Sequence, residues 1–412
     1  MDKIERIDTA IIGGGASGLF LACLLAAHNA ANENKIKFAL LERNERLGKK
    51  LSATGNGQGN VTNLAASETE YFSSANGEAL RAQNFIKKYP HTEFENFWAE
   101  LGVPLIYDER GRAYPAGRQA SALTDAARFF LAEKGADIRL QARVLALEKR
   151  EEGLLIRYQA EENQRLLLAK TAVLCVGGKA AKNFGTDGAG YALAQGLGHT
   201  CTPLYPSLVQ LKTDVAHTKT LKGIRVNDGK LTARAGEKEV VLRGDIIFTD
   251  YGVSGDAAFR ISAFLADKIG KTDVTLSIDF LPEFTIEQIQ YALQRKKENF
   301  PSLPTGELLF GIVNNQVGRA ISKRADGDLD KAAALIKNFP LAVTGSLGFD
   351  YAQVTKGGIP LLETDENLQS RLVSGLYFAG EILDVDGACG GFNLQWAYSS
   401  ARAVADALCA KL

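Results

Sequence analysis

A glycine-rich turn near the start of the chain constrains the fold more than any other feature. The segment DTAIIGGGASGLFLACLL carries the spacing G-x-G-x-x-G at Gly13, Gly15 and Gly18, between an apolar run and a run rich in Leu and Ala. This pattern predicts a buried strand over 7–12 and a helix over 16–31. In such a turn the first glycine permits the tight bend, the second permits close approach of a pyrophosphate, and the third permits strand–helix packing. The turn therefore predicts a dinucleotide-binding unit.

A carboxylate after the second apolar run supports this interpretation. The run 37–41 ends in Glu42, which follows Gly18 at close to the roughly 20 residues typical of the acid that binds a ribose hydroxyl. A solvated strand end is the alternative for Glu42, and the surrounding pattern favours the ribose. The first amides of the helix are expected to face the phosphates. The cofactor contacts predicted in this unit are Gly13, Gly15, Ala16, Ser17, Gly18, Glu42 and Arg43.

The next segment, GKKLSATGNGQGNVTN, separates FAD from NAD as the expected dinucleotide. It predicts a long loop over 48–63 with no regular element, and a loop of this length usually has a function. The flavin ring of FAD needs a second cradle far from the first, whereas a mobile surface loop is the alternative. We favour the cradle and assign to it Lys49, Lys50, Ser52, Thr54, Asn56, Gly57, Asn60 and Thr62.

The C-terminal segment predicts a further strand–acid–glycine–helix unit. In GLYFAGEILDVDGACGGFNLQWAYSS we expect a strand over 376–379, a glycine-rich turn over 387–391 and a helix from about 393. The acid accepts hydrogen bonds from ribityl hydroxyls, and the positive end of the helix stabilises the reduced flavin at its pyrimidine edge. For Asp384 and Asp386, loop capping remains an equal alternative. The residues assigned to the flavin here are Gly380, Glu381, Asp384, Gly391, Phe392 and Asn393.

A central apolar run, TAVLCVGGKAA, predicts a strand that meets Gly177 and Gly178 near the adenosine half of the cofactor. Val144, in a strand expected over 138–146, is assigned to the adenine. Both assignments rest partly on analogy.

Taken in order, these motifs resemble a bacterial family of FAD-dependent oxidoreductases, often called the aminoacetone oxidase family. Its fold is similar to that of the glutathione-reductase-like FAD superfamily. The resemblance extends through FTDYGVSG and AQVTKGGI and spans nearly the whole chain. One departure is clear, because the family pattern Gly-Arg-Cys-Asn is replaced by Gly57, Gln58, Gly59 and Asn60. We expect FAD binding to survive, whereas substrate choice, redox tuning and activity stay open.

The fold class expected is α/β, with a split Rossmann-like FAD-binding domain, an inserted β-rich domain and a small helical domain. The FAD-binding motifs lie at both ends, and short alternating runs in the middle predict antiparallel strands. Within FTDYGVSG and the residues after it, Tyr251, Ser254 and Asp256 are either pocket residues or a structural turn. The predicted ranges are 1–199 and 356–412 for the FAD domain, 200–282 with 338–355 for the β-rich domain, and 283–337 for the helical part.

Charge, cysteine and histidine content disfavour several classes of function. Lys and Arg together number 48, as do Asp and Glu, so no net charge draws the chain to nucleic acid or membrane. The five cysteines form no C-x-x-C pair and the four histidines are scattered, so we expect no metal site and no dithiol chemistry. The N-terminus has no signal-peptide pattern and no apolar run spans a membrane, which predicts a cytoplasmic protein without a membrane partner.

Three functions compete. The first is an FAD-dependent oxidoreductase acting on a small molecule, for which the family resemblance implies amine oxidation or reduction of an enone C=C bond. Because there is no second G-x-G-x-x-G unit, NAD(P)H would visit the flavin only transiently. The second, which the family resemblance implies, is reduction of a uracil ring in ribosomal RNA. A basic face on the helical part would serve it, and a solvated helix surface is the favoured alternative. The third is flavin binding with little catalysis. Catalytic residues and oligomeric state stay open. The basic face comprises Arg295, Lys296, Lys297, Arg319, Lys323 and Arg324.

Overall fold

The structure is a computed structural model that describes residues 4–67, 71–74, 77–216 and 218–411. Contacts within the chain divide it into two compact units. Unit 1 comprises 1–205 and 354–412, and unit 2 comprises 206–353. The chain therefore leaves unit 1 once and returns to it once.

Unit 1 is built on a seven-stranded mixed sheet in the order β7-β2-β1-β10-β9-β8, with β19 pairing with the end of β10. The pairs β1–β2, β2–β7, β1–β10 and β10–β19 are parallel, and β8, β9 and β10 form an antiparallel meander. The strands are β1 (Glu5–Ile12), β2 (Phe38–Leu41), β7 (Asp137–Arg139), β8 (Ala142–Arg150), β9 (Gly153–Ala160), β10 (Asn163–Leu174) and β19 (Leu376–Phe378). Because β1 and β19 both pair with β10, the two ends of the chain join one sheet.

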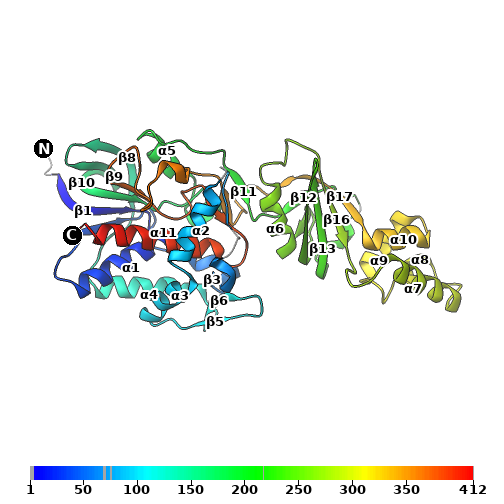
Figure 1. Cartoon of the computed structure of the whole chain (residues 1–412). Helices are drawn as coiled ribbons and strands as arrows, with labels where there is room; N and C mark the ends of the chain where they lie inside the picture. Colours follow the sequence, from blue (N-terminus) through cyan, green and yellow to red (C-terminus); the bar gives the residue numbers. More distant parts are fainter. Residues whose placement is uncertain (1–3, 68–70, 75–76, 217, 412) are drawn as a thin grey trace. The chain divides into compact units, whose positions relative to one another are not determined.

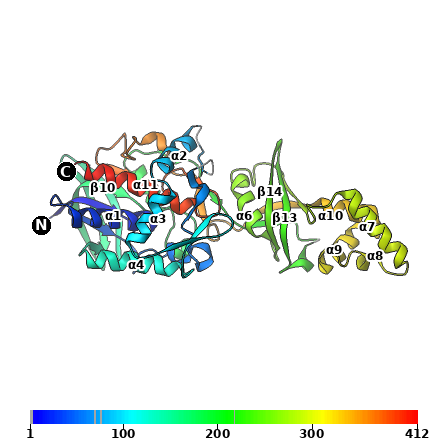
Figure 2. The ribbon, with the colours of Figure 1, turned by 60° about the horizontal axis from the view of Figure 1, so that its bottom comes forward.

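Helices α1 and α11 pack along each other beside this sheet (Figures 1 and 2). Phe20 of α1 meets Phe94 at 5.2 Å between ring centroids, and Phe94 stacks on Tyr398 of α11 at 4.4 Å. Such aromatic pairs add about 1 kcal/mol each beyond their buried area. The helices of unit 1 are α1 (Ala16–Ala31), α2 (Glu78–Lys88), α3 (His91–Glu100), α4 (Ala120–Glu133), α5 (Ala189–Gln195) and α11 (Phe392–Cys409).

Short elements complete unit 1. One small sheet has the order β3-β6-β5, and β20 pairs with β4. These elements are β3 (Thr62–Asn63), β4 (Tyr71–Phe72), β5 (Leu105–Tyr107), β6 (Arg112–Pro115), β18 (Val354–Lys356) and β20 (Asp386–Gly387), with the 3-10 turns η1 (Leu51–Gly57), η2 (Leu64–Ser67), η3 (Lys182–Phe184) and η5 (Leu361–Glu363). Strand β11 (Tyr205–Ser207) lies at the boundary of the units.

Unit 2 contains a closed barrel in the order β12-β15-β14-β13-β16-β17. Its hydrophobic core is continuous with that of the helices, because Ile289 and Leu293 of α7 belong to the same buried cluster as Leu231 and Phe339 of the barrel. The strands are β12 (Leu211–Thr213), β13 (Arg225–Ala235), β14 (Lys238–Phe248), β15 (Gly252–Ser254), β16 (Val274–Asp279) and β17 (Phe339–Ser346). The helices are η4 (Lys219–Leu221), α6 (Asp256–Leu265), α7 (Ile286–Asn299), α8 (Thr305–Leu308), α9 (Asn315–Ala325) and α10 (Leu329–Lys337).

The α/β fold class with a Rossmann-like parallel sheet and a β-rich insertion is confirmed, as is the helix over 16–31. Two local expectations are wrong. The strand predicted over 138–146 is interrupted where Gln141 takes the left-handed conformation (φ 53), so β7 and β8 are separate strands. The loop predicted over 48–63 contains η1, where the hydroxyls of Ser52 and Thr54 donate to carbonyls three residues earlier, and β3, which pairs with β6. Of the helices that the structure describes, none is both long and apolar enough to cross a bilayer.

Candidate functional site

The glycine turn between β1 and α1 has the geometry that its sequence suggests. Gly13 has φ +102, and a Cβ on it would lie 2.6 Å from the carbonyl oxygen of Cys175. A Cβ on Gly18 would lie 1.9 Å from the carbonyl oxygen of Gly13, so strand and helix approach too closely for any side chain. At Gly15 the situation is opposite, because among the described residues outside its chain neighbours no heavy atom lies within 4 Å of an added Cβ. The turn thus leaves open space beside Gly15.

Glu42 lies at the end of β2 and is 6% exposed. Its carboxylate accepts hydrogen bonds from the backbone N–H of Gly14 (2.6 Å) and from the backbone and side chain of Asn44 (2.7 and 2.6 Å). These bonds hold the glycine turn against β2. The neighbouring Arg43 donates to Asp187 at 2.8 Å and to the carbonyl of Gly185. The predicted ribose contact of Glu42 stays a prediction, and the structure adds a positioning role for its carboxylate.

Loop 48–63 reaches the C-terminal segment through an ion pair. The Lys50 ammonium lies 2.8 Å from one Glu381 carboxylate oxygen and 3.2 Å from the other, across 331 residues of sequence. Both side chains are about one-fifth exposed, at 24% and 21%. Lys49, in contrast, has its carboxylate partner Glu45 at 3.6 Å, and that partner is 68% exposed. Lys50 and Glu381 therefore join two segments that the sequence assigned to the flavin separately.

Several predicted donors of the loop are engaged with backbone carbonyls. The Ser52 hydroxyl donates to Lys49, and the Thr54 hydroxyl to Leu51, both at 2.8 Å. The Asn60 side-chain amide donates to the carbonyls of Thr62 (3.2 Å) and Ala113 (3.0 Å). These side chains shape the loop, while Asn56 and Gly57 lie on its exposed part with positive φ.

The start of α11 meets the same loop. A Cβ on Gly391, whose φ is +103, would lie 2.3 Å from the carbonyl oxygen of Thr62. The Thr62 hydroxyl donates to Gln395 at 2.5 Å, and Asn63 donates to the carbonyl of Gly390 at 3.1 Å. Among the residues that the structure describes, no side chain caps α11, whose first residue is Phe392, and the first amides of a helix have no intrahelical acceptor.

Asn393 fixes the turn before the helix, by accepting from the Gly387 N–H (2.8 Å) and donating to the Gly387 carbonyl (2.9 Å). Asn63 and Gln395 were missed by the sequence reasoning, and only their closeness to assigned motifs signals them.

The remaining assigned glycines lie where chain segments pack closely. A Cβ on Gly380 would meet the Ser17 hydroxyl at 2.6 Å, and one on Gly178 would meet the Thr355 hydroxyl at 2.4 Å. Thr355 also receives the N–H groups of Lys179 (2.7 Å) and Ala180 (2.9 Å), and its own N–H donates to Glu381 at 2.9 Å. Gly177 has positive φ in the same turn.

Val144 is half-buried in β8, on the meander side of the sheet. Thr355 was not assigned, although it lies within the motif AQVTKGGI.

Asp384 is fully buried and binds protein groups. Its carboxylate accepts from the Thr202 hydroxyl at 3.0 Å and from the Ser74 hydroxyl at 3.2 Å. Burial raises the pKa of this carboxyl, Glu78 raises it further, and the bonds from Thr202 and Ser74 oppose the shift. The alternative of loop capping thus has geometric support, and Asp386 pairs with Phe72 in the adjacent short sheet.

The raised pKa gives a pH prediction. Above the ordinary aspartate pKa and below the raised one, folded Asp384 holds a proton that the unfolded chain has lost, so stability falls as pH rises through this window. Asp384→Asn removes the effect. Urea unfolding from about pH 4 to about pH 7 should show wild type losing stability relative to this variant as pH rises. A stability difference independent of pH would contradict the prediction.

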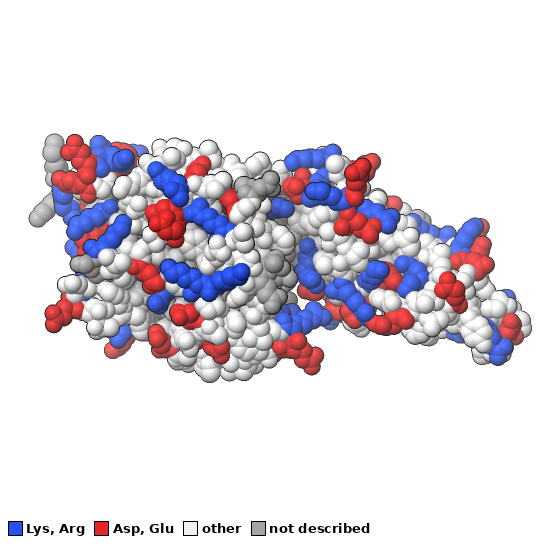
Figure 3. Space-filling model, in the orientation of Figure 1, with Lys and Arg blue, Asp and Glu red and all other residues white. Residues whose placement is uncertain are grey.

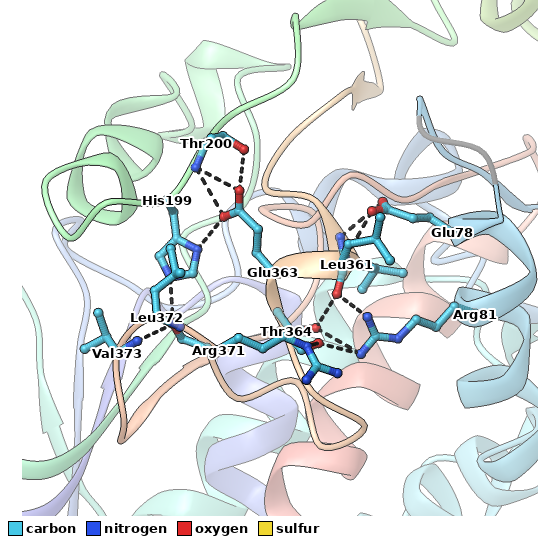
Figure 4. Close-up of polar contacts among 12 residues, drawn as sticks. Glu78, Arg81, His199, Thr200, Leu361, Glu363, Thr364, Arg371, Leu372 and Val373 are labelled. Carbon is cyan, nitrogen blue, oxygen red and sulfur yellow. Dashed lines mark hydrogen bonds and ion pairs between the residues drawn. The ribbon is translucent and has the colours of Figure 1, made fainter.

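A Ser–His–Glu series lies elsewhere in unit 1 (Figure 4). Glu363 lies 2.6 Å from Nδ1 of His199, and the Ser370 hydroxyl lies 2.8 Å from Nε2. The Ser370 oxygen also accepts from the N–H groups of Leu372 (3.0 Å) and Val373 (2.8 Å). Both lone pairs of the Ser370 oxygen are therefore used, and the His199 side chain is fully buried. Because the Ser370 oxygen has no free lone pair with which to attack a substrate, we assign this series a structural role.

Figure 4 also shows how α2 holds the segment that contains Glu363. The buried Glu78 carboxylate accepts from the N–H groups of Leu361 (3.1 Å) and Leu362 (3.0 Å) at the start of η5. Arg81 donates to the carbonyl of Thr364 at 2.8 Å. The sequence reasoning missed this clamp, since no local pattern links α2 to residues 361–364.

The predicted basic face of unit 2 is largely engaged in local contacts. Lys296 and Lys297 donate to the carbonyls of Phe310 and Pro301, and Arg295 pairs with Glu298 at 3.1 Å. Arg324 donates to the carbonyl of Pro340 at 2.9 Å, and Arg319 lies over the ring of Phe310. Figure 3 shows basic and acidic side chains interspersed on the face displayed. These contacts support the solvated helix surface that the charge balance favours.

Other candidate positions lie in unit 2. Ser254 ends β15, Asp256 begins α6 with Arg260 at 3.8 Å, and Tyr251 is half-buried. Within the described ranges, no three His, Cys, Asp or Glu side chains lie where they could hold a metal ion.

The residues of unit 1 fit an FAD molecule. The space beside Gly15 lies at the uncapped start of α1, which suits phosphates. The Lys50–Glu381 pair and the uncapped start of α11 lie on segments that meet loop 48–63. The two helix starts thus provide amides for a phosphate and for a ring edge.

Comparison with known proteins gives a consistent set of similarities. Residues 7–407 match the model of the HI0933-like protein Rossmann domain. The chain is 35% identical to a 3-dehydro-bile acid delta(4,6)-reductase of Clostridium scindens, over 95% of this chain and 96% of that protein. It is 28% identical to a ribosomal RNA dihydrouridine synthase of Haemophilus influenzae, over 97% of each.

Two solved structures share the fold. They are a 3-ketosteroid-delta4-(5alpha)-dehydrogenase from Rhodococcus jostii RHA1 (TM-score 0.51, 16% identity, 99% of this chain and 98% of that chain) and a 3-ketosteroid delta1-dehydrogenase from Sterolibacterium denitrificans (TM-score 0.55, 13% identity, 99% and 100%).

Proposed function

The chain belongs to the HI0933-like Rossmann family of flavoprotein oxidoreductases, and from this premise we propose that it reduces a carbon–carbon double bond conjugated to a ketone in a small molecule. The observation that carries the substrate class is the 35% identity, over nearly the full length of both chains, to a bile acid delta(4,6)-reductase. The oxidoreductase class of this chain and FAD as its cofactor follow from the family. The aminoacetone oxidase resemblance, and with it amine oxidation, stays a prediction.

When bound, reduced FAD would supply the hydride for such a reaction, and a proton from solvent would complete the reduction of the double bond. The chain's own part is to hold and orient. The space at Gly15 and the first amides of α1 receive the phosphates, and Glu42 keeps that turn against β2. The first amides of α11, placed by Asn393 and Thr62, provide positive partial charge where a flavin ring gains negative charge. Glu381, held by Lys50, offers carboxylate oxygens to ribityl hydroxyls.

An anaerobic titration tests this function. Purified yellow protein is reduced with dithionite and mixed with a 3-oxo-Δ4 steroid, and we expect the oxidised flavin spectrum to return while the enone absorbance disappears in equal amount. Reoxidation by oxygen but by no enone would contradict the proposal. Bleaching by NADPH or NADH tests the proposed electron source, and bleaching by a small amine would favour an oxidase instead. A yellow protein that no donor bleaches would favour flavin binding with little catalysis.

Reduction of a uracil ring in ribosomal RNA remains the second candidate, because two dihydrouridine synthases are 28% and 27% identical to the chain over nearly its full length. The zero net charge of the chain and the local hydrogen bonds of Lys296, Lys297 and Arg324 favour a solvated helix surface on α7 and α9. Retention of ribosomal RNA that weakens steeply with salt would support this candidate. We expect no such retention.

A further inference from the structure

Two arginines flank the buried ring of Tyr114 in β6, and only one of them has a carboxylate partner. The guanidinium carbon of Arg118 lies 4.6 Å from the ring centroid, and that of Arg112 lies 6.0 Å away. Arg112 is neutralised by Asp108, with Nη2 and a carboxylate oxygen 2.7 Å apart. Within the part of the chain that the structure describes, no carboxylate lies within 4.0 Å of Arg118. The guanidinium of Arg118 therefore lies over the Tyr114 ring without a carboxylate partner among the described residues.

The backbone and the side chain of Arg118 are both held in an unusual position. Its φ is +46, a left-handed conformation that costs a non-glycine residue free energy and often marks a functional position. Its N–H closes a turn onto the carbonyl of Pro115 at 2.7 Å. Its Nη1 donates to the side-chain oxygen of Gln58 at 3.2 Å. The guanidinium is thus fixed between an aromatic face and loop 48–63, although the residue is exposed.

This position adjoins the segments assigned to the flavin ring. Gln58 lies between Gly57 and Asn60, and Asn60 donates to the carbonyl of Ala113, the residue before Tyr114. On the other side, a Cβ on Gly390 would lie 3.6 Å from Cδ of Arg112, so the turn before α11 borders the same strand. The resembling family carries Arg and Cys where this chain carries Gln58 and Gly59. Arg118, which is distant in sequence, brings a cation to this position through its contact with Gln58.

We propose that Arg118 binds a carboxylate group on the substrate of the proposed reductase, and this inference rests on that proposed function. An unneutralised guanidinium with a fixed plane recognises a carboxylate through two parallel N–H···O bonds. The adjoining ring of Tyr114 supports one face of the guanidinium and leaves its N–H edge for an anion. The substrate class is therefore an enone that carries a carboxylate, as a steroid acid does, in preference to a neutral steroid.

A pair of ligands that differ only in charge tests the assignment. Binding of a 3-oxo-Δ4 steroid carboxylic acid and of its methyl ester to the oxidised protein is measured by perturbation of the flavin spectrum, without turnover. For Arg118→Ala we expect the Kd of the acid to rise roughly tenfold and that of the ester to change by less than about twofold. Arg118→Lys should recover part of the affinity, because lysine keeps the charge but loses the planar fork. Arg128→Ala removes an exposed arginine of α4 that pairs with Asp125, and it should change neither Kd.

The outcomes separate this inference from the proposed function. Equal losses for acid and ester in Arg118→Ala, no loss for either, or no binding of the acid to wild type would overturn the role of Arg118. If both ligands reoxidise reduced wild-type flavin while the variant treats acid and ester alike, the reductase stands and the carboxylate site falls. If the acid binds through Arg118 but neither ligand reoxidises the flavin, the carboxylate site stands and the proposed function falls.

Discussion

Gly15→Val is expected to give a folded but colourless protein. The space beside Gly15 is free of described side chains, so the valine fits the apoprotein and leaves the fold intact, but it fills the place at the start of α1 that a pyrophosphate needs. We expect FAD affinity to fall by at least roughly a hundredfold, which corresponds to about 2.7 kcal/mol. The measurement is the flavin absorbance per mole of purified protein, together with its recovery on addition of FAD.

Gly345→Val is the matched control for this substitution. Gly345 lies in β17 of unit 2, and the nearest atom to an added Cβ is 3.9 Å away, so the variant should remain yellow. Thermal unfolding of both apoproteins shows whether the fold is kept. A fully yellow Gly15→Val protein would mean that the phosphates of the cofactor lie elsewhere.

Breaking the Lys50–Glu381 pair is expected to have the second largest effect. Glu381→Ala leaves the Lys50 ammonium unpaired and removes the acceptor of the Thr355 N–H, in a place where both charged side chains are only about one-fifth exposed. We expect a loss of about 2–3 kcal/mol in the free energy of unfolding, together with weaker retention of FAD. Urea unfolding and flavin content measure the two effects.

A double-mutant cycle isolates the pair from its surroundings. Lys50→Met, Glu381→Gln and the combined variant should give a coupling energy of about 1–2 kcal/mol. Each single substitution removes one charge of the pair and leaves the charge of the other residue without a counter-charge. The neighbouring Lys49→Met is the matched control, since its partner Glu45 is largely exposed, and it should cost less than about 1 kcal/mol. Additive effects of Lys50→Met and Glu381→Gln would show that the two segments are held together by other contacts.

Local patterns in the sequence were sufficient for the first strand–turn–helix unit. The helix over 16–31 was predicted with its observed limits, and the start of α11 was missed by only one residue. Both depend on short-range effects, namely apolar periodicity and glycines at turns. The strand over 138–146 failed for the same kind of reason, because nothing in its apolar run signals the left-handed Gln141 that separates β7 from β8.

The polar contacts of the candidate site could not be predicted from local sequence patterns. Asp384 receives Thr202 and Ser74, Glu363 receives His199, and Arg118 meets Gln58, all across sequence distances that carry no periodic signal. The sequence lists these side chains as donors and acceptors without saying which of them are already satisfied. Ser52 and Thr54 show the consequence, since both were assigned to the flavin and both donate to carbonyls of their own loop.

From the sequence alone came the class of the fold and a dinucleotide as its cofactor, because a glycine turn, the strand before it and the helix after it are local and their spacing follows from backbone geometry. Only the tertiary structure decided which charges meet. The ion pair between Lys50 and Glu381 and the contact of Arg118 with Gln58 depend on packing that brings loop 48–63 against the segments after β19 and after β6. A hydrogen bond or ion pair forms wherever two groups are brought within about 3 Å, and that distance is set by packing rather than by order along the chain.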